Sequence, residues 1–300
     1  MGQMIKNQNY DYSALKNAIF ELNSQYPEMR VGSIGKSVLG RDIHYLKFGT
    51  GPKHILLAGG FHGSEHITSV IMLKFAEDIC RNLNGGLEFQ GVNLKRGLAG
   101  RSVIIIPRVN PDGCEISISG EKTAFHLASF VRKVSRRDTK HWNANARGVD
   151  INHNFDADWE QVRALERKNG ILAPCPSRYG GRHPFSEPES VALRDFCLNN
   201  DFSYVLAFHS QGEVIYWSFG KNTPAYSEKM ASVLSVSSGY ALDVPIGTAV
   251  GGGFKDWFIS RFCRPGFTVE LGKGVNPLPP EDAEKIYTKI KDMLTISIIM

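Results

Sequence analysis

The sequence lacks any apolar run long enough to span a membrane. Its longest apolar stretch near the end of the chain covers only residues 293–300, whereas a transmembrane helix needs roughly 20 residues. Residues 1–12 are polar and contain no apolar core of the kind that a secretory signal peptide needs. We therefore expect a soluble, cytoplasmic protein without a membrane partner.

Cysteine is scarce, and no CxxC pair occurs. An odd number of widely separated cysteines fits a reducing compartment better than a disulfide framework, and it argues against a cysteine metal site. The five positions are Cys80, Cys114, Cys175, Cys197 and Cys263.

An excess of one charge is also missing, because 35 Lys and Arg residues face 30 Asp and Glu residues. The only local basic cluster, residues 132–140, has no aromatic residues interleaved with it. It is typical of a solvated loop rather than a nucleic-acid surface, so we expect no nucleic-acid partner.

Strands and helices alternate along the chain, which has no visible repeat or linker. Apolar runs predict strands at 31–34, 43–48, 54–58, 102–109, 202–208, 213–217 and 266–271. Helical spacing predicts helices at 12–22, 64–83, 156–168, 187–198, 226–236, 254–262 and 280–300. The Asn-Pro-Asp-Gly sequence at 110–113 predicts a turn, 118–146 is either a loop or a region folded around something, and 170–188 is a long surface loop. Residues 1–300 are thus predicted to form one α/β domain with a mostly parallel or mixed sheet.

The segment at residues 53–72 contains the first candidate metal ligands, and the interpretation of the later segments depends on it. A predicted strand ends at Gly59 and Gly60, and His62 and Glu65 follow just before a helical pattern begins. Ligands of open α/β sheets lie beyond the carboxyl ends of strands, so both side chains can point at one metal ion. A capping role for the pair fits equally well until partners are found downstream.

Two such partners occur. His209 follows the strand predicted at 202–208, and Glu270 lies within the last apolar strand, where an unpaired carboxylate would be costly. Taken singly, His209 could be an ordinary loop histidine, and Glu270 could be the buried partner of an arginine. Two histidines and one glutamate, with a position left for water, are the ligand set of catalytic zinc hydrolases, and a further carboxylate is the expected general base.

Four segments in this order resemble the zinc carboxypeptidase family: His62-Gly-Ser-Glu65, Gly148-Val-Asp-Ile-Asn152, His209-Ser-Gln and Thr268-Val-Glu270. The resemblance implies a three-layer α/β/α sandwich around a mixed, mainly eight-stranded sheet. It also implies one Zn²⁺ per chain, bound by His62, Glu65 and His209, with Glu270 activating a water molecule. The activity it implies is that of a metallopeptidase acting on a peptide substrate.

The chain departs from the family at several substrate-binding positions. An Asn-Arg pair holds the substrate's terminal carboxylate in the family, but Asn152-His153 occupies that place here, and histidine lacks the planar fork of arginine. The family's oxyanion arginine would fall near Asn143, with Arg147 the nearest cation in sequence. We favour Arg147 as the catalytic residue that stabilises the oxyanion, with Asn143 as the alternative.

The remaining positions bear on specificity. The tyrosine that caps the substrate in the family would fall near Thr248, so that contact is absent or comes from Tyr216 or Tyr179. Lys255, before Asp256-Trp257, occupies the specificity position, and a cation there favours a substrate side chain with a carboxylate.

Diaminopimelate carries such a carboxylate, whereas lysine does not. The chain therefore resembles the branch that cleaves γ-D-glutamyl bonds to an L-diamino acid in bacterial cell-wall peptides, which makes a muropeptide the expected substrate. Alternatives are a conventional carboxypeptidase, an acylamino acid deacylase on the same scaffold, or a non-catalytic peptide-binding module.

Overall fold

The computed structural model describes residues 3–85 and 88–300. Eight strands form one mixed sheet in the order β1-β2-β4-β3-β5-β8-β6-β7. The central strands β4, β3, β5 and β8 run parallel. The pairs β1–β2, β2–β4 and β8–β6 are antiparallel, and the edge strand β7 pairs in parallel with β6. The strands are β1 (Arg30–Lys36), β2 (Asp42–Phe48), β3 (Lys53–Ala58), β4 (Arg101–Ile106), β5 (Phe202–His209), β6 (Val214–Tyr216), β7 (Ala241–Asp243) and β8 (Gly266–Glu270).

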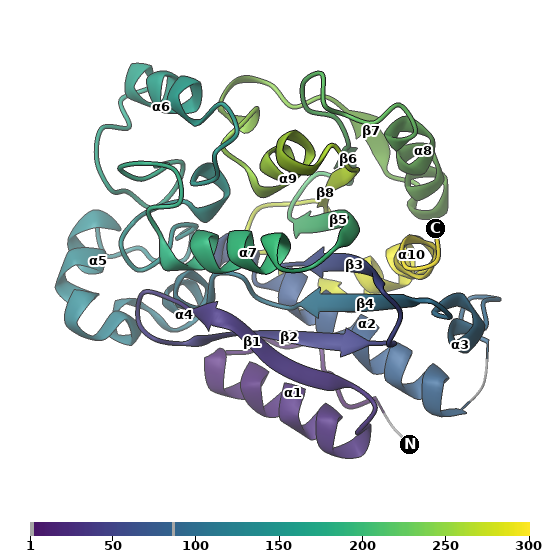
Figure 1. Cartoon of the computed structure of the whole chain (residues 1–300). Helices are drawn as coiled ribbons and strands as arrows, with labels where there is room; N and C mark the ends of the chain where they lie inside the picture. Colours follow the sequence, from purple (N-terminus) through teal and green to yellow (C-terminus); the bar gives the residue numbers. More distant parts are fainter. Residues whose placement is uncertain (1–2, 86–87) are drawn as a thin grey trace.

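Helices cover both faces of the sheet (Figure 1). One face packs against α1 (Tyr12–Gln25), α2 (Ile67–Gly85), α8 (Ser227–Ser238) and α10 (Asp282–Ser297), and the other against α7 (Pro188–Leu198) and α9 (Phe254–Phe262). The shorter helices are α3 (Leu94–Gly97), α4 (Pro111–Ser119), α5 (Ala128–Val134) and α6 (Trp159–Lys168). This arrangement confirms the predicted α/β sandwich around a mixed, eight-stranded sheet.

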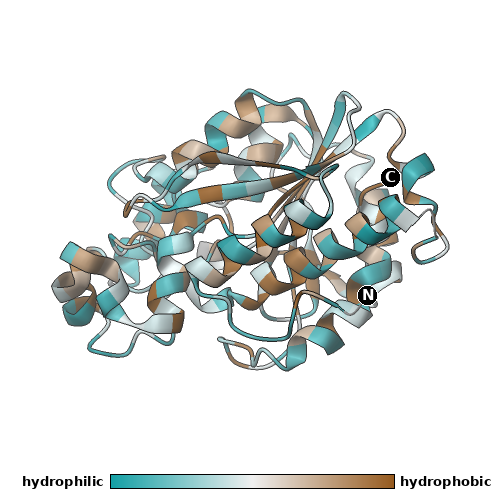
Figure 2. Ribbon diagram, turned by 90° about the horizontal axis from the view of Figure 1, so that it is seen from below, coloured by the Kyte–Doolittle hydropathy of each residue, from teal (hydrophilic) through white to brown (hydrophobic). Residues whose placement is uncertain are grey.

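The middle strands are buried on both faces. Residues 55–58 of β3 and 103–106 of β4 are all buried, as expected for continuous runs of apolar residues in a parallel sheet. Figure 2 shows the hydrophobic colours gathered in these strands and the hydrophilic colours on the outer faces of the helices. The core therefore lies on both sides of β3, β4 and β5 and fixes the position of their carboxyl ends.

The turn predicted at residues 110–113 is wrong, because α4 begins there. The side chain of Asn110 caps the helix by accepting a hydrogen bond from the Gly113 N–H, and Pro111 is the first helical residue. Asparagine followed by proline and aspartate serves a helix start as well as a turn. The uncertain segment 118–146 contains the end of α4 and all of α5.

Two further properties concern the predicted state of the cysteines and the predicted lack of a membrane-spanning segment. All five cysteines are free thiols. Within residues 3–85 and 88–300, no helix combines the length and the apolar character that a bilayer crossing requires.

Candidate active site

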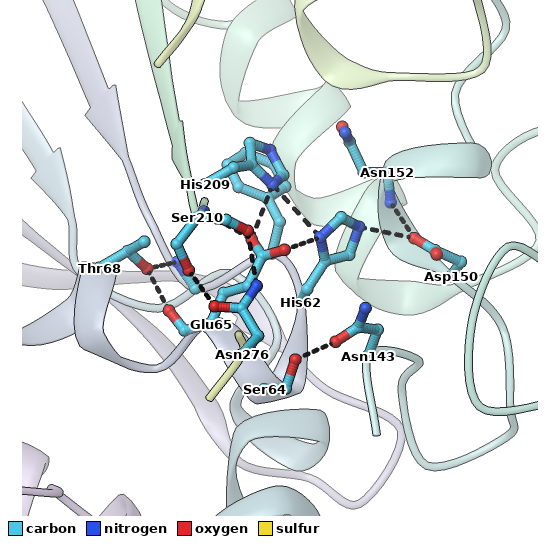
Figure 3. Close-up of polar contacts among 12 residues, drawn as sticks. His62, Ser64, Glu65, Thr68, Asn143, Asp150, Asn152, His209, Ser210 and Asn276 are labelled. Carbon is cyan, nitrogen blue, oxygen red and sulfur yellow. Dashed lines mark hydrogen bonds and ion pairs between the residues drawn. The ribbon is translucent and has the colours of Figure 1, made fainter. Parts of the chain in front are cut away.

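Three side chains from two distant segments of the sequence meet beyond the ends of the central strands (Figure 3). His62 and Glu65 follow β3, and His209 is the last residue of β5, which pairs in parallel with β3. Parallel neighbours end at the same edge of a sheet, so the fold brings the three together. The side chain of His62 makes no capping hydrogen bond at the short turn it precedes.

The turn between β3 and α2 depends on glycine at two positions. Gly60 has a φ of +63°, which L side chains rarely adopt. A Cβ on Gly63 would lie 2.3 Å from the carbonyl oxygens of Gly113 and Trp142. Glycine therefore allows the chain to turn tightly and to place His62 against the sheet.

The donor atoms of the cluster fit a zinc ion. His62 Nδ1 lies 2.8 Å from Glu65 Oε1, and His209 Nδ1 lies 3.1 Å from Glu65 Oε2. The two Nδ1 atoms are 3.3 Å apart. Donors about 2.0–2.1 Å from a tetrahedral zinc lie about 3.3 Å from one another, so the cluster is already close to that geometry. It is the one group of metal-ligating residues found in the described part of the chain.

Asp150 orients the cluster, a role that the sequence analysis did not assign. Its Oδ1 lies 3.0 Å from His62 Nε2, and its Oδ2 accepts a hydrogen bond of 2.8 Å from the Arg178 N–H. A carboxylate behind a ligating histidine holds the ring with its other nitrogen free for the metal. The Gly148-Val-Asp-Ile-Asn152 segment was the signal that could have identified it.

The electrostatics of the cluster favour a positive charge at its centre. Burial on its own lowers the pKa of His62, but the carboxylates of Glu65 and Asp150 raise it well above its usual value. Burial opposes ionisation of Glu65, yet His62 and His209 lower the pKa of that carboxyl to about 2. A proton on His62 or a divalent cation compensates the negative charge of the Glu65 and Asp150 carboxylates, which again fits a metal site.

Glu270 ends β8 directly beside His209, its register partner on β5. Burial raises the pKa of Glu270 to about 8, the charge of Glu65 adds to the shift, and His62 opposes it. A divalent cation among the ligands would lower that pKa again. Glu270 is therefore a carboxyl group that can both accept and release a proton near neutral pH.

Ser210 and Asn276 were also missed by the sequence analysis. The Ser210 N–H donates to Glu65 Oε2 at 3.2 Å. Ser210 and Asn276 exchange two hydrogen bonds, from the hydroxyl to the amide oxygen and from the amide NH₂ to the carbonyl, at 2.8 and 2.7 Å. They hold the chain that follows His209 against Glu65.

A cavity of about 150 Å³ opens beside His62, His209 and Glu270 and contains Lys255 on its wall. Lys255 lies in α9 and is only 5% exposed. Its ammonium donates to the Ser218 carbonyl at 2.8 Å and pairs with Asp256. Because an ammonium has three N–H groups, one remains for a ligand in the cavity.

Asn152 and His153 line the same cavity. The Asn152 side chain accepts a hydrogen bond of 3.0 Å from the Phe254 N–H, which ties it to the start of α9. His153 Nδ1 lies 2.8 Å from a carboxylate oxygen of Glu166. The structure therefore brings both residues to the metal cluster, with His153 held by a buried carboxylate.

The two oxyanion candidates lie in different places. Asn143 lines a second cavity with His62 and Glu65. Arg147 lines a separate cavity, and its guanidinium lies 3.5 Å from a carboxylate oxygen of Glu187. Only Asn143 is brought beside the metal cluster.

The three positions considered for the residue that caps the bound substrate also lie in different places. Tyr216, at the end of β6, lines the cavity that contains Lys255. Tyr179 lines the cavity of Arg147, and the Arg163 guanidinium stacks over its ring at 4.5 Å. The side chain of Thr248 lies outside the described part of the structure.

Comparison with known proteins agrees with this geometry. Residues 15–293 match the family model of the zinc carboxypeptidases. The chain belongs to the zinc carboxypeptidase family. It is 38% identical over 283 residues, 93% of this chain and 70% of the relative, to gamma-D-glutamyl-L-diamino acid endopeptidase 1 of Lysinibacillus sphaericus. A Bacillus subtilis protein without a characterised function is 32% identical over 289 residues, which cover 95% of this chain and 76% of the relative.

The fold of this zinc carboxypeptidase also recurs in solved structures. Bovine thrombin-activatable fibrinolysis inhibitor, in complex with tick carboxypeptidase inhibitor, superposes with a TM-score of 0.75 at 19% identity, over 98% of this chain and 96% of that one. Family membership confirms the predictions of a zinc cofactor, a metallopeptidase and a peptide substrate.

Proposed function

We propose that this zinc peptidase hydrolyses the bond between γ-D-glutamate and an L-diamino acid, meso-diaminopimelate, in bacterial cell-wall peptides. The name of the relative from Lysinibacillus sphaericus supports the bond type. The observation that carries the proposal is the buried ammonium of Lys255 in the cavity beside Glu270. A lysine there suits a leaving group whose side chain ends in a carboxylate.

His62, Glu65 and His209 are the zinc ligands in this proposal. Zinc, when bound, acts as a Lewis acid on the scissile carbonyl and lowers the pKa of a water molecule to roughly 7. Asp150 keeps His62 in the tautomer that offers Nδ1, since its own oxygen accepts the Nε2 proton at 3.0 Å. Ser210 holds the Glu65 carboxylate through its backbone N–H.

Glu270 is the general base and then the general acid. It accepts one proton from the attacking water as the new C–O bond forms at the scissile carbon. The same carboxyl group gives that proton to the amide nitrogen as the C–N bond breaks, so a carboxylic acid and a free amine leave. Its place beside His209 positions it for both transfers.

Asn143 is the better candidate for stabilising the oxyanion. Its amide oxygen accepts a hydrogen bond from the Ser64 hydroxyl, so its NH₂ group is left to donate toward the cavity that it shares with His62. A neutral amide donor is a recognised element of an oxyanion hole. We propose no catalytic role for Arg147, which pairs with Glu187 in another cavity.

Lys255, Asn152, His153 and Tyr216 are the proposed contacts to the leaving amino acid, because all four line the cavity with Glu270. Thr248 stays a prediction from the sequence.

We further propose that residues 1–300 act as one peptidase domain, because all eight strands lie in one sheet. Five free thiols support a reducing compartment, which favours the cytoplasm.

The test is a comparison of three peptides by mass spectrometry. L-Ala-γ-D-Glu-meso-diaminopimelate, its L-Lys analogue and an α-linked peptide with a free carboxyl terminus are each incubated with the zinc enzyme, with and without a chelator. We expect chelator-sensitive cleavage of the diaminopimelate peptide. Cleavage of the α-linked peptide alone would overturn the proposal and indicate a conventional carboxypeptidase.

A further inference from the structure

A second cavity shares His62 and His153 with the cavity of Lys255, but the rest of its lining differs. It measures about 450 Å³ and includes Asn143 and Arg178. Glu270 and Lys255 line only the first cavity. A substrate that places its scissile carbonyl at the metal cluster, with its leaving group beside Glu270, therefore has its acyl side in the second cavity.

The backbone of Arg178 is fixed relative to the metal cluster. Its N–H donates to one oxygen of Asp150 at 2.8 Å, and the other oxygen of Asp150 lies 3.0 Å from His62 Nε2. Asp150 is almost completely buried. One rigid carboxylate thus links Arg178 to a metal-ligating histidine, so the distance between the arginine backbone and the reacting bond is set by the fold.

Arg178 also has a φ of +66°, in the left-handed region where glycine is favoured. Residues held in such a conformation cost about 1–3 kcal/mol and concentrate at binding and catalytic sites. The loop therefore holds Arg178 in a conformation that costs free energy, at the wall of the second cavity.

The charge of Arg178 is open to a ligand. Its side chain is exposed, and no carboxylate of the described residues forms an ion pair with it. By contrast, Arg147 pairs with Glu187, and Arg163 pairs with Glu166. An unpaired guanidinium on the wall of a cavity is a ready binding group for a carboxylate, which it can hold with two parallel hydrogen bonds.

The acyl group of the proposed substrate carries such a carboxylate. In a γ-linked glutamyl residue the scissile carbonyl belongs to the side chain, so the α-carboxylate remains free, separated from that carbonyl by two methylene groups and the Cα. We propose that Arg178 binds this α-carboxylate and thereby selects a γ-linked glutamyl residue over acyl groups that carry no carboxylate at that distance. The inference rests on the proposed function, because the proposed glutamyl acyl group is what supplies a carboxylate at that distance from the scissile carbonyl.

The experiment compares two substrates that differ only in this group. One is L-Ala-γ-D-Glu-meso-diaminopimelate, and the other carries an α-carboxamide on the same D-glutamyl residue. We expect the wild-type zinc enzyme to favour the carboxylate in kcat/KM. Arg178→Gln should lose at least about tenfold on the carboxylate substrate and little on the carboxamide, so that the preference disappears. Arg178→Lys should retain part of it, because it keeps the charge and loses the fork.

Arg182→Gln is the matched control. Arg182 is an exposed arginine in the same loop, but it lines the cavity of Arg147 instead. It should leave the preference unchanged, and zinc content and thermal unfolding should show that all variants are folded. Equal losses on both substrates in Arg178→Gln, or a preference that survives the substitution, would overturn the role of Arg178 while leaving the proposed function intact. Failure of the wild-type enzyme to cleave either peptide would instead overturn the proposed function.

Discussion

His62 Nε2 and Asp150 Oδ1 lie 3.0 Å apart, on the side of the imidazole ring that faces away from Glu65 and His209. One ring nitrogen therefore serves the metal cluster, and the other is held by a carboxylate that is itself fixed by backbone N–H groups. The orientation of His62 thus depends on a residue 88 positions away in the sequence.

Replacing Asp150 with asparagine should weaken zinc binding about 10- to 100-fold, because a neutral amide oxygen holds the Nε2 proton of His62 less strongly than a carboxylate and makes the ring a weaker ligand. Competition with a chromogenic chelator measures the zinc dissociation constant. Asp156→Asn, an exposed aspartate in the same segment, is the control. Unchanged zinc affinity in a folded Asp150→Asn protein would contradict the orienting role.

Glu270→Gln should keep zinc and lose about 10²- to 10⁴-fold in kcat, since the amide can neither accept the water proton nor return it. Zinc content by mass spectrometry and turnover of the diaminopimelate peptide measure the two properties separately. Turnover within a few-fold of the wild type would show that another group is the base.

The sequence predicted what depends on local pattern. Helix α9 begins and ends at the residues predicted, 254 and 262, and His209 ends the strand that was expected to deliver it. Apolar spacing carries such information because burial of one face follows directly from it. The metal-ligating residues could be found because each lies at or just beyond the end of an apolar strand.

What could not be predicted depends on contacts between distant segments. Asp150, Ser210 and Asn276 are ordinary polar residues until the fold places them beside His62 and Glu65. The sequence favoured Arg147 over Asn143 as the oxyanion residue, and only the fold shows that Asn143 shares a cavity with His62 while Arg147 lines another. The turn read at Asn110 failed for a different reason, because the same residue types also start helices.

Lys255 gives a prediction about specificity. In Lys255→Met, kcat/KM for the diaminopimelate peptide should fall by about tenfold or more, while that for the L-Lys analogue should change little, because only the former has the carboxylate that the ammonium would bind. Steady-state kinetics on both peptides measures the ratio.

The same substitution leaves the buried Asp256 without its ion-pair partner, although the Gly251 N–H still donates to it, so a second variant is needed. Lys255→Met combined with Asp256→Asn removes both charges and should show the same loss of selectivity with better stability. A selectivity ratio that stays at the wild-type value in both variants would rule out Lys255 as the specificity residue.

Glu189, in α7, gives a prediction about the pH dependence of folding. It is fully buried, and its carboxylate oxygens accept hydrogen bonds from the Val38 N–H and the Asn145 amide. Burial raises its pKa to about 8, and the nearby charge of Asp112 adds to the shift. The folded protein therefore keeps a proton on Glu189 that the unfolded chain loses above its ordinary pKa of about 4.3.

The sign of the effect follows from that difference in bound protons. From about pH 5 to pH 8 the folded state binds more protons than the unfolded state, so the contribution of Glu189 to the free energy of unfolding falls as the pH rises, by up to about 1.4 kcal/mol per pH unit. Glu189→Gln lacks this term, and its stability relative to the wild type should rise over the same range. Urea unfolding at pH 5, 6.5 and 8 with equal zinc loading measures this, with exposed Glu21→Gln as the control. A difference between Glu189→Gln and wild type that stays constant with pH would mean that Glu189 is ionised in the folded protein, and that Asn145 and Val38 suffice to stabilise its charge.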